Sequence, residues 1–224
     1  MYKQSVELIR ETVNGTRRKQ IYELGETGDF TSPVIYVMKP AGDTLTIHGN
    51  DPFEKYINLD AVNPGIEIIR TGSSMNTGVV FTDSNTTIVR IFCTSAREVL
   101  ILKKNFIKTA IDVLAKYGAT VMLSTHRPKA NDLVFTKAGQ EKKFSGSVTD
   151  IDNLFFSFFI CFEFNASKIE GVYKLDTDKI LSRGEVKHIT DIVGGLREIA
   201  PSIPETVVDE IIYRLAESLH WSLK

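Results

Sequence analysis

The sequence predicts an α/β fold, an α+β arrangement in which a mixed sheet is covered by helices. Short β-branched segments alternate with segments of helical periodicity, and some strand-like segments follow one another as hairpins. The composition of 42% hydrophobic and 25% charged residues is that of a chain with an ordinary core. A length of 224 residues suits one large domain. We therefore expect a single domain over residues 1–224.

Runs rich in Val, Ile, Thr and Phe, bounded by Pro, Gly, Asn or Asp, predict the strands. They are residues 32–40, 43–50, 65–72, 79–83, 86–94, 120–124, 131–136 and 142–148. The runs 79–83 and 86–94 are expected to pair with each other, and the last run is expected to be broken at Gly146. The aromatic run 153–165 predicts a buried central strand or a helix–strand junction.

Apolar residues at helical spacing predict three helices. They cover residues 2–13, 97–117 and 204–221. Gly118 is a natural stop for the second helix. The first would belong to an N-terminal extension over residues 1–30, and the polar segment 14–20 is expected to break it. Residues 51–62 predict a short helix or an irregular turn.

Charge and cysteine usage limit the classes of partner. Lys and Arg number 27 against 28 Asp and Glu, so no overall basic field favours nucleic acid. No apolar run approaches the ~20 residues of a membrane helix, so we expect no membrane partner and a cytoplasmic location. Cys93 and Cys161 lie in apolar runs and are expected to be buried thiols, and the scattered histidines lack metal-ligand spacing.

A polar loop of small residues follows the predicted strand that ends at Arg70. It contains Ser73, Ser74, Asn76, Thr77 and Gly78. Small residues let backbone N–H groups converge on an anion, and an arginine at the loop's entrance would add positive charge. An ordinary polar hairpin loop remains the alternative. The loop lacks the Gly-Lys-Ser/Thr ending of a Walker motif.

Two further short segments bear charge beside apolar residues. Asn131 and Asp132 precede a strand, which is also a normal turn entry. In "KKFSGS", Lys143 stands directly before an apolar residue and a small Ser-Gly-Ser turn. A solvated lysine leading into a strand explains this pattern. The alternative is a lysine aimed at an anionic group, which Gly146 allows the backbone to approach.

Taken in order, these blocks resemble the lipoate–protein ligase A family between residues 33 and 198. The matching blocks are "IHGNDPFEKYINLD", "IRTGSSMNTGVVFTDSN", "KANDLVF", "KKFSGSV" and "SRGEVKHITDIVGGLRE". The resemblance implies a biotin/lipoate protein ligase-like catalytic domain. It also implies that lipoate or octanoate reacts with ATP to form an acyl-adenylate, which a lysine of a lipoyl domain then attacks.

The resemblance assigns roles to individual residues. Lys143 matches the family's catalytic lysine in "KISGSA". The positions implied to bind the ligand or the adenylate are Arg70, Ser73, Ser74, Asn76, Thr77, Gly78, Asp83, Asn131, Asp132, Ser145, Gly146 and Ser147. ATP, Mg²⁺ and lipoate are implied as substrates and ion, with no tightly bound cofactor and no protein metal site. The family's three consecutive glycines appear here as Asn76, Thr77 and Gly78.

The implied partner is a lipoyl-domain acceptor, such as the H protein or the E2 chain of a 2-oxoacid dehydrogenase. No C-terminal accessory domain is recognisable, so a separate accessory subunit stays open. Two other functions also stay open. One is an ATP-independent lipoyl or octanoyl transferase, for which a cysteine nucleophile is expected. The other is a non-catalytic binding module that kept the scaffold.

Overall fold

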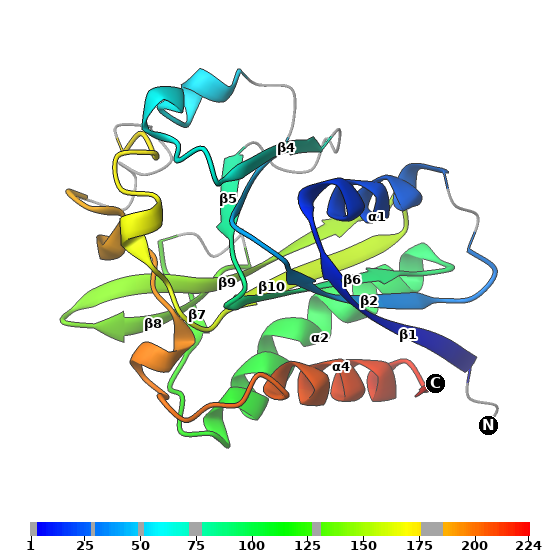
Figure 1. Cartoon of the computed structure of the whole chain (residues 1–224). Helices are drawn as coiled ribbons and strands as arrows, with labels where there is room; N and C mark the ends of the chain where they lie inside the picture. Colours follow the sequence, from blue (N-terminus) through cyan, green and yellow to red (C-terminus); the bar gives the residue numbers. More distant parts are fainter. Residues whose placement is uncertain (1–3, 28–29, 49–51, 72–77, 127–130, 176–185) are drawn as a thin grey trace.

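The computed structural model describes residues 4–27, 30–48, 52–71, 78–126, 131–175 and 186–224. Its described strands form an eight-stranded sheet in the order β11-β1-β2-β6-β10-β9-β8-β7 and a three-stranded sheet in the order β4-β3-β5 (Figure 1). The strands are β1 (Gln4–Val13), β2 (Val34–Pro40), β3 (Thr44–His48), β4 (Glu67–Thr71), β5 (Gly78–Thr82), β6 (Thr86–Phe92), β7 (Met122–Leu123), β8 (Leu133–Lys137), β9 (Gln140–Asp150), β10 (Phe155–Cys161) and β11 (Trp221–Leu223). The helices are α1 (Gly15–Thr27), α2 (Ala96–Ala115) and α4 (Val207–Ser218). The predicted mixed α/β class is confirmed.

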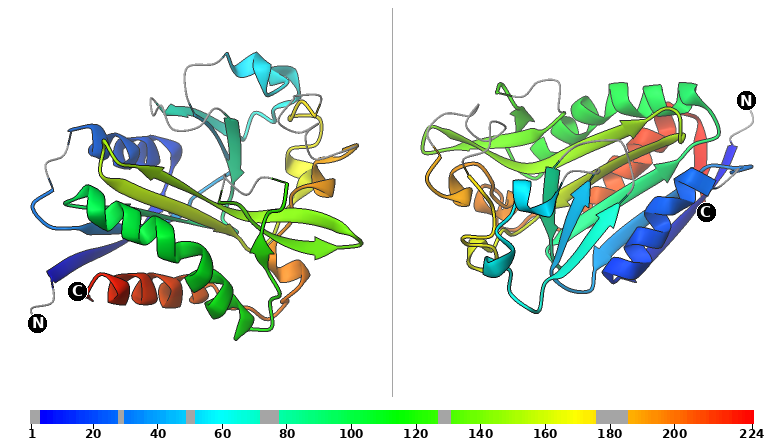
Figure 2. Two further views of the ribbon diagram at one scale, coloured as in Figure 1. Left: turned by 180° about the vertical axis from the view of Figure 1, so that it is seen from behind. Right: turned by 90° about the horizontal axis from the view of Figure 1, so that it is seen from above.

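The large sheet has helices on both faces. The helices α2 and α4 lie side by side on one face, and α1 lies on the other (Figure 2). The larger core lies under α2 and α4, and a smaller core lies under α1. The central strand β6 is buried at every position, and it pairs antiparallel with β2 and β10. The aromatic run of β10 is therefore a buried central strand, as one of the two alternatives predicted.

The helix α2 shows how local signals and packing agree. Ser95 caps its N-terminus by accepting a hydrogen bond from the Glu98 amide at 3.4 Å, and Gly118 ends the segment with φ +78°. Phe106 is fully buried, and its ring centroid lies 5.4 Å from that of Phe156 and 4.7 Å from that of Phe158. The helix thus carries a large part of the core against β10. The helix predicted at 204–221 is also confirmed, as α4.

The small sheet is attached to α1 by a buried guanidinium. Arg18 is 1% exposed and donates to the hydroxyl of Thr82 at 2.5 Å and to the hydroxyl of Thr46. Burial lowers the pKa of Arg18, because the charged form loses its hydration. Beside it, the Gly15 amide donates to the Glu67 carboxylate at 2.7 Å. These contacts connect α1 to all three strands of the small sheet.

The predicted helix at residues 2–13 is wrong over its described part, because Gln4–Val13 form β1, and positions 2 and 3 lie outside the described residues. The strand lies in the interior of the sheet, pairing parallel with β2 and with β11. Val6 faces the core under α2 and α4, whereas Val13 faces the core under α1. A strand with apolar residues on both faces lacks the regular alternation of apolar and polar residues that marks most strands. The helical spacing of the apolar residues in this segment therefore arose by chance. The predicted break at 14–20 is wrong as well, since α1 occupies it.

The structure also differs from the predictions in strand pairing and in where several elements begin and end. The segments of β5 and β6 do not pair with each other, because β5 pairs with β3 in the small sheet while β6 is central in the large one. The strand β9 continues through Gly146 without a break. Trp221 begins the strand β11 instead of ending a helix. Residues 51–62 form 3₁₀ turns at Phe53–Lys55 and Leu59–Ala61, with position 51 outside the described residues.

Within the described part of the chain, no helix combines the length and the apolar character that crossing a bilayer requires.

We expect Phe106→Ala to lower the free energy of unfolding by about 3–5 kcal/mol, because it removes a fully buried ring and leaves a cavity against β10. Urea denaturation followed by circular dichroism measures this. Leu100→Ala on the same helix is the matched control, since Leu100 is 47% exposed and its loss should change stability by no more than about 0.5 kcal/mol. Equal losses in the two variants would contradict the packing described for α2.

Candidate functional site

The candidate site is built on the hairpin of β8 and β9. The two strands are joined by Ala138 and Gly139, whose φ angles are +52° and +80°. Positive φ at both central residues is typical of the type I′ turn, whose twist suits a tight hairpin. The turn fixes the strand pairing from Lys137 and Gln140 inward, and so determines which residues of β9 lie beside β8.

A β-bulge in β9 determines which side of the sheet Lys143 faces. Val134 pairs with Lys143 and Leu133 pairs with Ser145, so Phe144 is an extra residue without a partner on β8. Phe144 is fully buried in the core under α2. In a regular strand, residues 143 and 146 would face opposite sides of the sheet. The extra residue places the Lys143 side chain and Gly146 on the same side.

Lys143 forms an ion pair with the carboxylate of Asp132. The Lys143 Nζ lies 2.7 Å from Asp132 Oδ1, and the side chains are 24% and 4% exposed respectively. The ammonium also lies 5.6 Å from the centroid of the Phe159 ring. A Cβ at Gly146 would come 3.0 Å from the Lys143 Nζ and 3.1 Å from Asp132 Oδ1. Glycine is therefore the residue that leaves room for this pair.

Asp132 is held by the segment around it. The preceding residue, Asn131, has φ +51°, a conformation that asparagine tolerates better than most residues. The Ser124 amide donates to the Asp132 carbonyl at 2.9 Å. The Glu141 carboxylate accepts from the Ser124 hydroxyl at 2.9 Å and from the Thr125 amide at 3.1 Å. Glu141 on β9 thus fixes the end of β7 next to the residue that pairs with Lys143.

The backbone of Lys143 is held on its other edge by Ile192 and Gly194, which lie in the last of the five matching blocks but were given no role in the sequence analysis. The Lys143 amide donates to the Ile192 carbonyl at 2.8 Å, and the Gly194 amide donates to the Lys143 carbonyl at 3.1 Å. The "GG" pair in this block was the local sequence signal for a close approach of the backbone.

The structure places the remaining predicted residues in three ways. Gly146 adjoins the ion pair, as described above. Ser145 and Ser147 are buried, and they lie across from Ile160 and Phe158, which belong to the core under α2. Their hydroxyls therefore face away from Lys143, and only their backbone is close to the site. Gly78 begins β5, and the predicted loop residues Ser73, Ser74, Asn76 and Thr77 lie outside the described residues.

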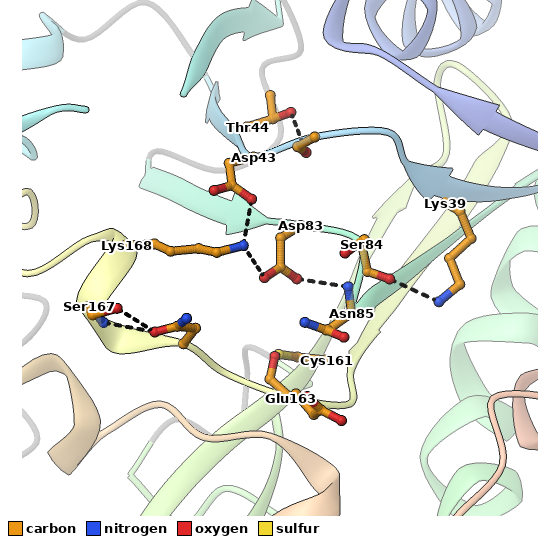
Figure 3. A network of polar contacts seen from close by, with 12 residues as sticks. Lys39, Asp43, Thr44, Asp83, Ser84, Asn85, Cys161, Glu163, Ser167 and Lys168 are labelled. Carbon is orange, nitrogen blue, oxygen red and sulfur yellow. Dashed lines mark hydrogen bonds and ion pairs between the residues drawn. The ribbon is translucent and has the colours of Figure 1, made fainter. Parts of the chain in front are cut away.

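Arg70 and Asp83 make contacts in and around the small sheet. The Arg70 guanidinium lies 4.2 Å from the centroid of the Phe53 ring. The Asp83 carboxylate lies 3.2 Å from Lys168 Nζ, which also binds Asp43 at 2.8 Å (Figure 3). The hydrogen bond to Asp43 is the largest of the effects that raise the pKa of Lys168. Lys168 thus joins the β2–β3 turn to the crossing between the sheets, and the roles of Arg70 and Asp83 in binding stay predictions.

The two cysteines are buried, as the sequence predicted. Burial raises the pKa of Cys161 to about 12, and it also raises the pKa of Cys93. The Cys161 Sγ donates to the Glu163 carbonyl at 3.2 Å (Figure 3). Neither thiol has the cationic, partly exposed surroundings of an activated nucleophile. Among the described residues, no group of three or more His, Cys, Asp and Glu side chains could hold a metal ion.

Comparison with known proteins identifies the fold. No family model matches the sequence, and no curated protein matches it. A bipartite lipoate protein ligase from Thermoplasma acidophilum, described with its E2 lipoyl domain, matches over 100% of this chain and 86% of that chain, with 14% identity and a TM-score of 0.72. A putative lipoate protein ligase from the same organism, with bound lipoic acid, matches over 100% and 88%, with 15% identity and a TM-score of 0.68.

A lipoate–protein ligase A bound with ATP also matches over 100% of this chain and 88% of that chain, with 14% identity and a TM-score of 0.70. Such identities carry information about architecture alone. The chain therefore has the lipoate–protein ligase fold, and the fold expected from the resemblance is confirmed.

We expect Glu141→Gln to flatten the loss of stability in acid. Burial of Glu141 raises its pKa, but hydrogen bonds from Thr125 and Ser124 outweigh burial and hold the pKa below the ordinary value of 4.5. A lowered folded-state pKa contributes stability above the unfolded pKa, and this contribution is lost as pH falls through the folded pKa. Thermal melts between pH 7 and about pH 3 would measure the difference. Parallel curves for the variant and the native chain would contradict this role of Glu141.

Proposed function

We propose that this chain is a lipoate–protein ligase-like acyltransferase, which attaches lipoate or octanoate to a lysine of a lipoyl domain through an acyl-adenylate. One observation carries the proposal. Lys143, at the position of the family's catalytic lysine, is a partly exposed ammonium held by a nearly buried carboxylate, beside a glycine where a Cβ would crowd the pair. The fold in which this pair is found supports the same reading.

The proposed reaction has two steps. In the first, a carboxylate oxygen of the fatty acid bonds to the α-phosphorus of ATP, and pyrophosphate leaves. In the second, the acceptor lysine nitrogen bonds to the acyl carbon and loses a proton, while the bond to AMP breaks and AMP leaves with the electron pair. Both steps concentrate negative charge on oxygen atoms near the acyl carbon. A fixed cation at that point lowers the barrier.

Lys143 suits this role because its charge is positioned before any ligand arrives. Asp132 pairs with the ammonium, and the side chain of Lys143 keeps 24% of its surface exposed. An ammonium has three donors, so a ligand oxygen can bind without displacing Asp132. The fixed geometry means that little reorganisation is required when charge develops in the transition state.

Mg²⁺ would enter as a complex with ATP. Such ions are commonly held by one or two carboxylates together with substrate phosphates, and they neutralise charge on the leaving pyrophosphate. The residues proposed to meet the nucleotide include Asn76 and Thr77, where the family has glycine.

The proposed acceptor is a lipoyl domain. A bipartite ligase of similar fold is described together with its E2 lipoyl domain, which supports an acceptor of the same kind for this chain. The H protein and a separate accessory subunit belong to the same proposal and rest on the resemblance, and the cytoplasmic location stays a prediction. The buried thiols argue against the cysteine-dependent transferase.

The decisive experiment is intact-mass spectrometry of an apo lipoyl domain incubated with the protein, ATP, Mg²⁺ and lipoate. We expect the mass increase of one lipoyl group. Lys143→Ala should reduce the rate by about 10²–10³, because a preorganised charge is lost at the reacting atoms. Lys104→Ala is the matched control, since Lys104 is exposed on α2 on the opposite side of the sheet and should leave the rate unchanged.

Synthetic lipoyl-adenylate, supplied in place of lipoate and ATP, separates the alternatives. Transfer from the adenylate but not from ATP would place the defect in the adenylation step. No transfer from either source would refute the ligase proposal and favour a binding module.

We further expect Cys93→Ser and Cys161→Ser to retain the transfer rate of the native protein, because neither thiol is required as a nucleophile. Alkylation with iodoacetamide at pH 8 should label both cysteines only after unfolding. A loss of activity in Cys161→Ser without a loss of stability would revive the transferase alternative.

A further inference from the structure

Residues 192–198 form a structured segment that contacts β9 beyond the point where the pairing of β9 with β10 ends. The last residue of β9 that pairs with β10 is Ser145, which faces Ile160. Lys143 lies beyond this point and forms a parallel bridge with Val193 instead. The segment therefore replaces a strand of the sheet at one position, and that position is Lys143.

Both backbone groups of Lys143 are engaged by this segment. Its amide donates to the Ile192 carbonyl at 2.8 Å, and its carbonyl accepts from the Gly194 amide at 3.1 Å. On the opposite edge, Lys143 pairs with Val134 of β8. The main chain is thus fixed from two sides next to a bulge, where a strand would otherwise be free to shift.

Two glycines allow the segment to approach so closely. A Cβ at Gly194 would lie 2.5 Å from Glu198 Oε1 and 2.8 Å from Cζ of Phe135, a fully buried ring. A Cβ at Gly195 would lie 2.6 Å from the Phe162 carbonyl oxygen and 2.6 Å from the Glu163 Cα, both of which are backbone atoms. Neither φ lies in the left-handed region, so the requirement for glycine is one of space.

The far end of the segment is anchored. Glu198 accepts from the Gly195 amide at 3.0 Å and forms ion pairs with Lys137 at 2.8 Å and Lys142 at 3.7 Å. Leu196 is fully buried in the main core. The adjacent lysines of β9 thus have separate partners, since Lys142 pairs with Glu198 while Lys143 pairs with Asp132.

We propose that Gly194 and Glu198 are positioning residues for Lys143, and that the segment 192–198 holds the backbone of β9 so that the ammonium meets the ligand at a fixed point. Asp132 fixes the end of the side chain, whereas this segment fixes its beginning. A displacement of about 1 Å at a catalytic group can lower the rate about 10²-fold. Contacts that hold the main chain of Lys143 in place are therefore expected to affect the rate. The kinetic part of this proposal rests on the proposed function, and the structural part does not.

The structural part is tested by the chemical reactivity of the lysine itself. The native protein is acetylated with trace isotopic acetic anhydride, and the relative rate at each lysine is read by peptide mass spectrometry. Lys104 on α2 is the internal standard. We expect Gly194→Ala to raise the rate at Lys143 about threefold or more, because local opening exposes the side chain. Gly42→Ala is the matched control, since a Cβ at Gly42 meets no atom within 4 Å.

The variant Asp132→Asn serves as a reference, because it gives the acetylation rate of Lys143 when its side chain has lost the ion pair with the carboxylate. A folded Gly194→Ala protein with the native rate at Lys143 would overturn the proposal. If that variant does not fold, Glu198→Gln decides, because it weakens the anchor without adding an atom beside β9. We expect a smaller rise at Lys143 for it, and a native rate there would overturn the proposal equally.

The kinetic part is tested in the transfer assay. We expect Gly194→Ala and Glu198→Gln to lower kcat about tenfold or more with little change in KM for lipoate, because the ligand contacts stay while the charge is misplaced. A change in KM alone would contradict positioning. If the native protein shows no transfer at all, the proposed function fails, and the labelling result still decides whether the segment holds Lys143.

Discussion

The single extra residue in β9 is the constraint on which the candidate site depends. Because Phe144 has no partner on β8, the strand changes the side to which its residues point. An apolar ring is turned into the core, and the neighbouring lysine is turned out of it. Without the bulge, Lys143 and Gly146 would face opposite sides of the sheet, and the ion pair with Asp132 would lose the open space beside it. The bulge is therefore what makes a charged site from an otherwise buried sheet.

Two cations, Arg18 and Lys168, connect the small sheet to the rest of the molecule, and their charges are stabilised in different ways. Arg18 is fully buried and is held by hydroxyl groups, so its pKa falls. Lys168 is partly exposed and is held by two carboxylates, so its pKa rises. The first connects α1 to the small sheet, and the second connects the turn before that sheet to the chain that leaves it. These polar contacts add to an apolar cluster in which Leu45 and Ile47 of β3 pack with Ile57, Ile169 and Val172.

The sequence predicted much of the fold, and its failures have physical causes. The helix α2 was predicted because one apolar face and a clear stop coincide, and β10 was predicted because its aromatic run is too dense for a surface element. The strand β1 was missed because its two faces meet two different cores. The helix α1 was missed because its sequence is largely polar and Ile21 is its one fully buried apolar residue. Residues 83–85 connect β5 in one sheet to β6 in the other, but their sequence resembles a hairpin turn. The crossing has no sign in the sequence, because β5 and β6 each pair with strands that are not their neighbours along the chain.

The candidate site was predicted in part. Lys143, Asp132 and Gly146, which the resemblance assigned to one site, lie together in the structure, and their roles in binding and catalysis stay predictions. The bulge could not be predicted, because "KKFSGS" reads equally well as a regular strand that would send Ser145 toward the ligand. The contribution of Gly194 could not be predicted either. A glycine required by space and not by φ carries no local signature of its contacts here, since the Phe135 ring and the Lys143 backbone beside Gly194 are distant in sequence.

The spacing of these residues along the chain has a consequence for the order of folding. Asp132 and Lys143 belong to one hairpin, so the loop that brings them together is short and closes at small entropic cost. Gly194 reaches Lys143 only after a much longer stretch of chain has been ordered. Local contacts form before distant ones in most small domains. The lysine would then acquire its charged partner early in folding, while the main chain beneath it becomes fixed only when the last third of the molecule has taken its place.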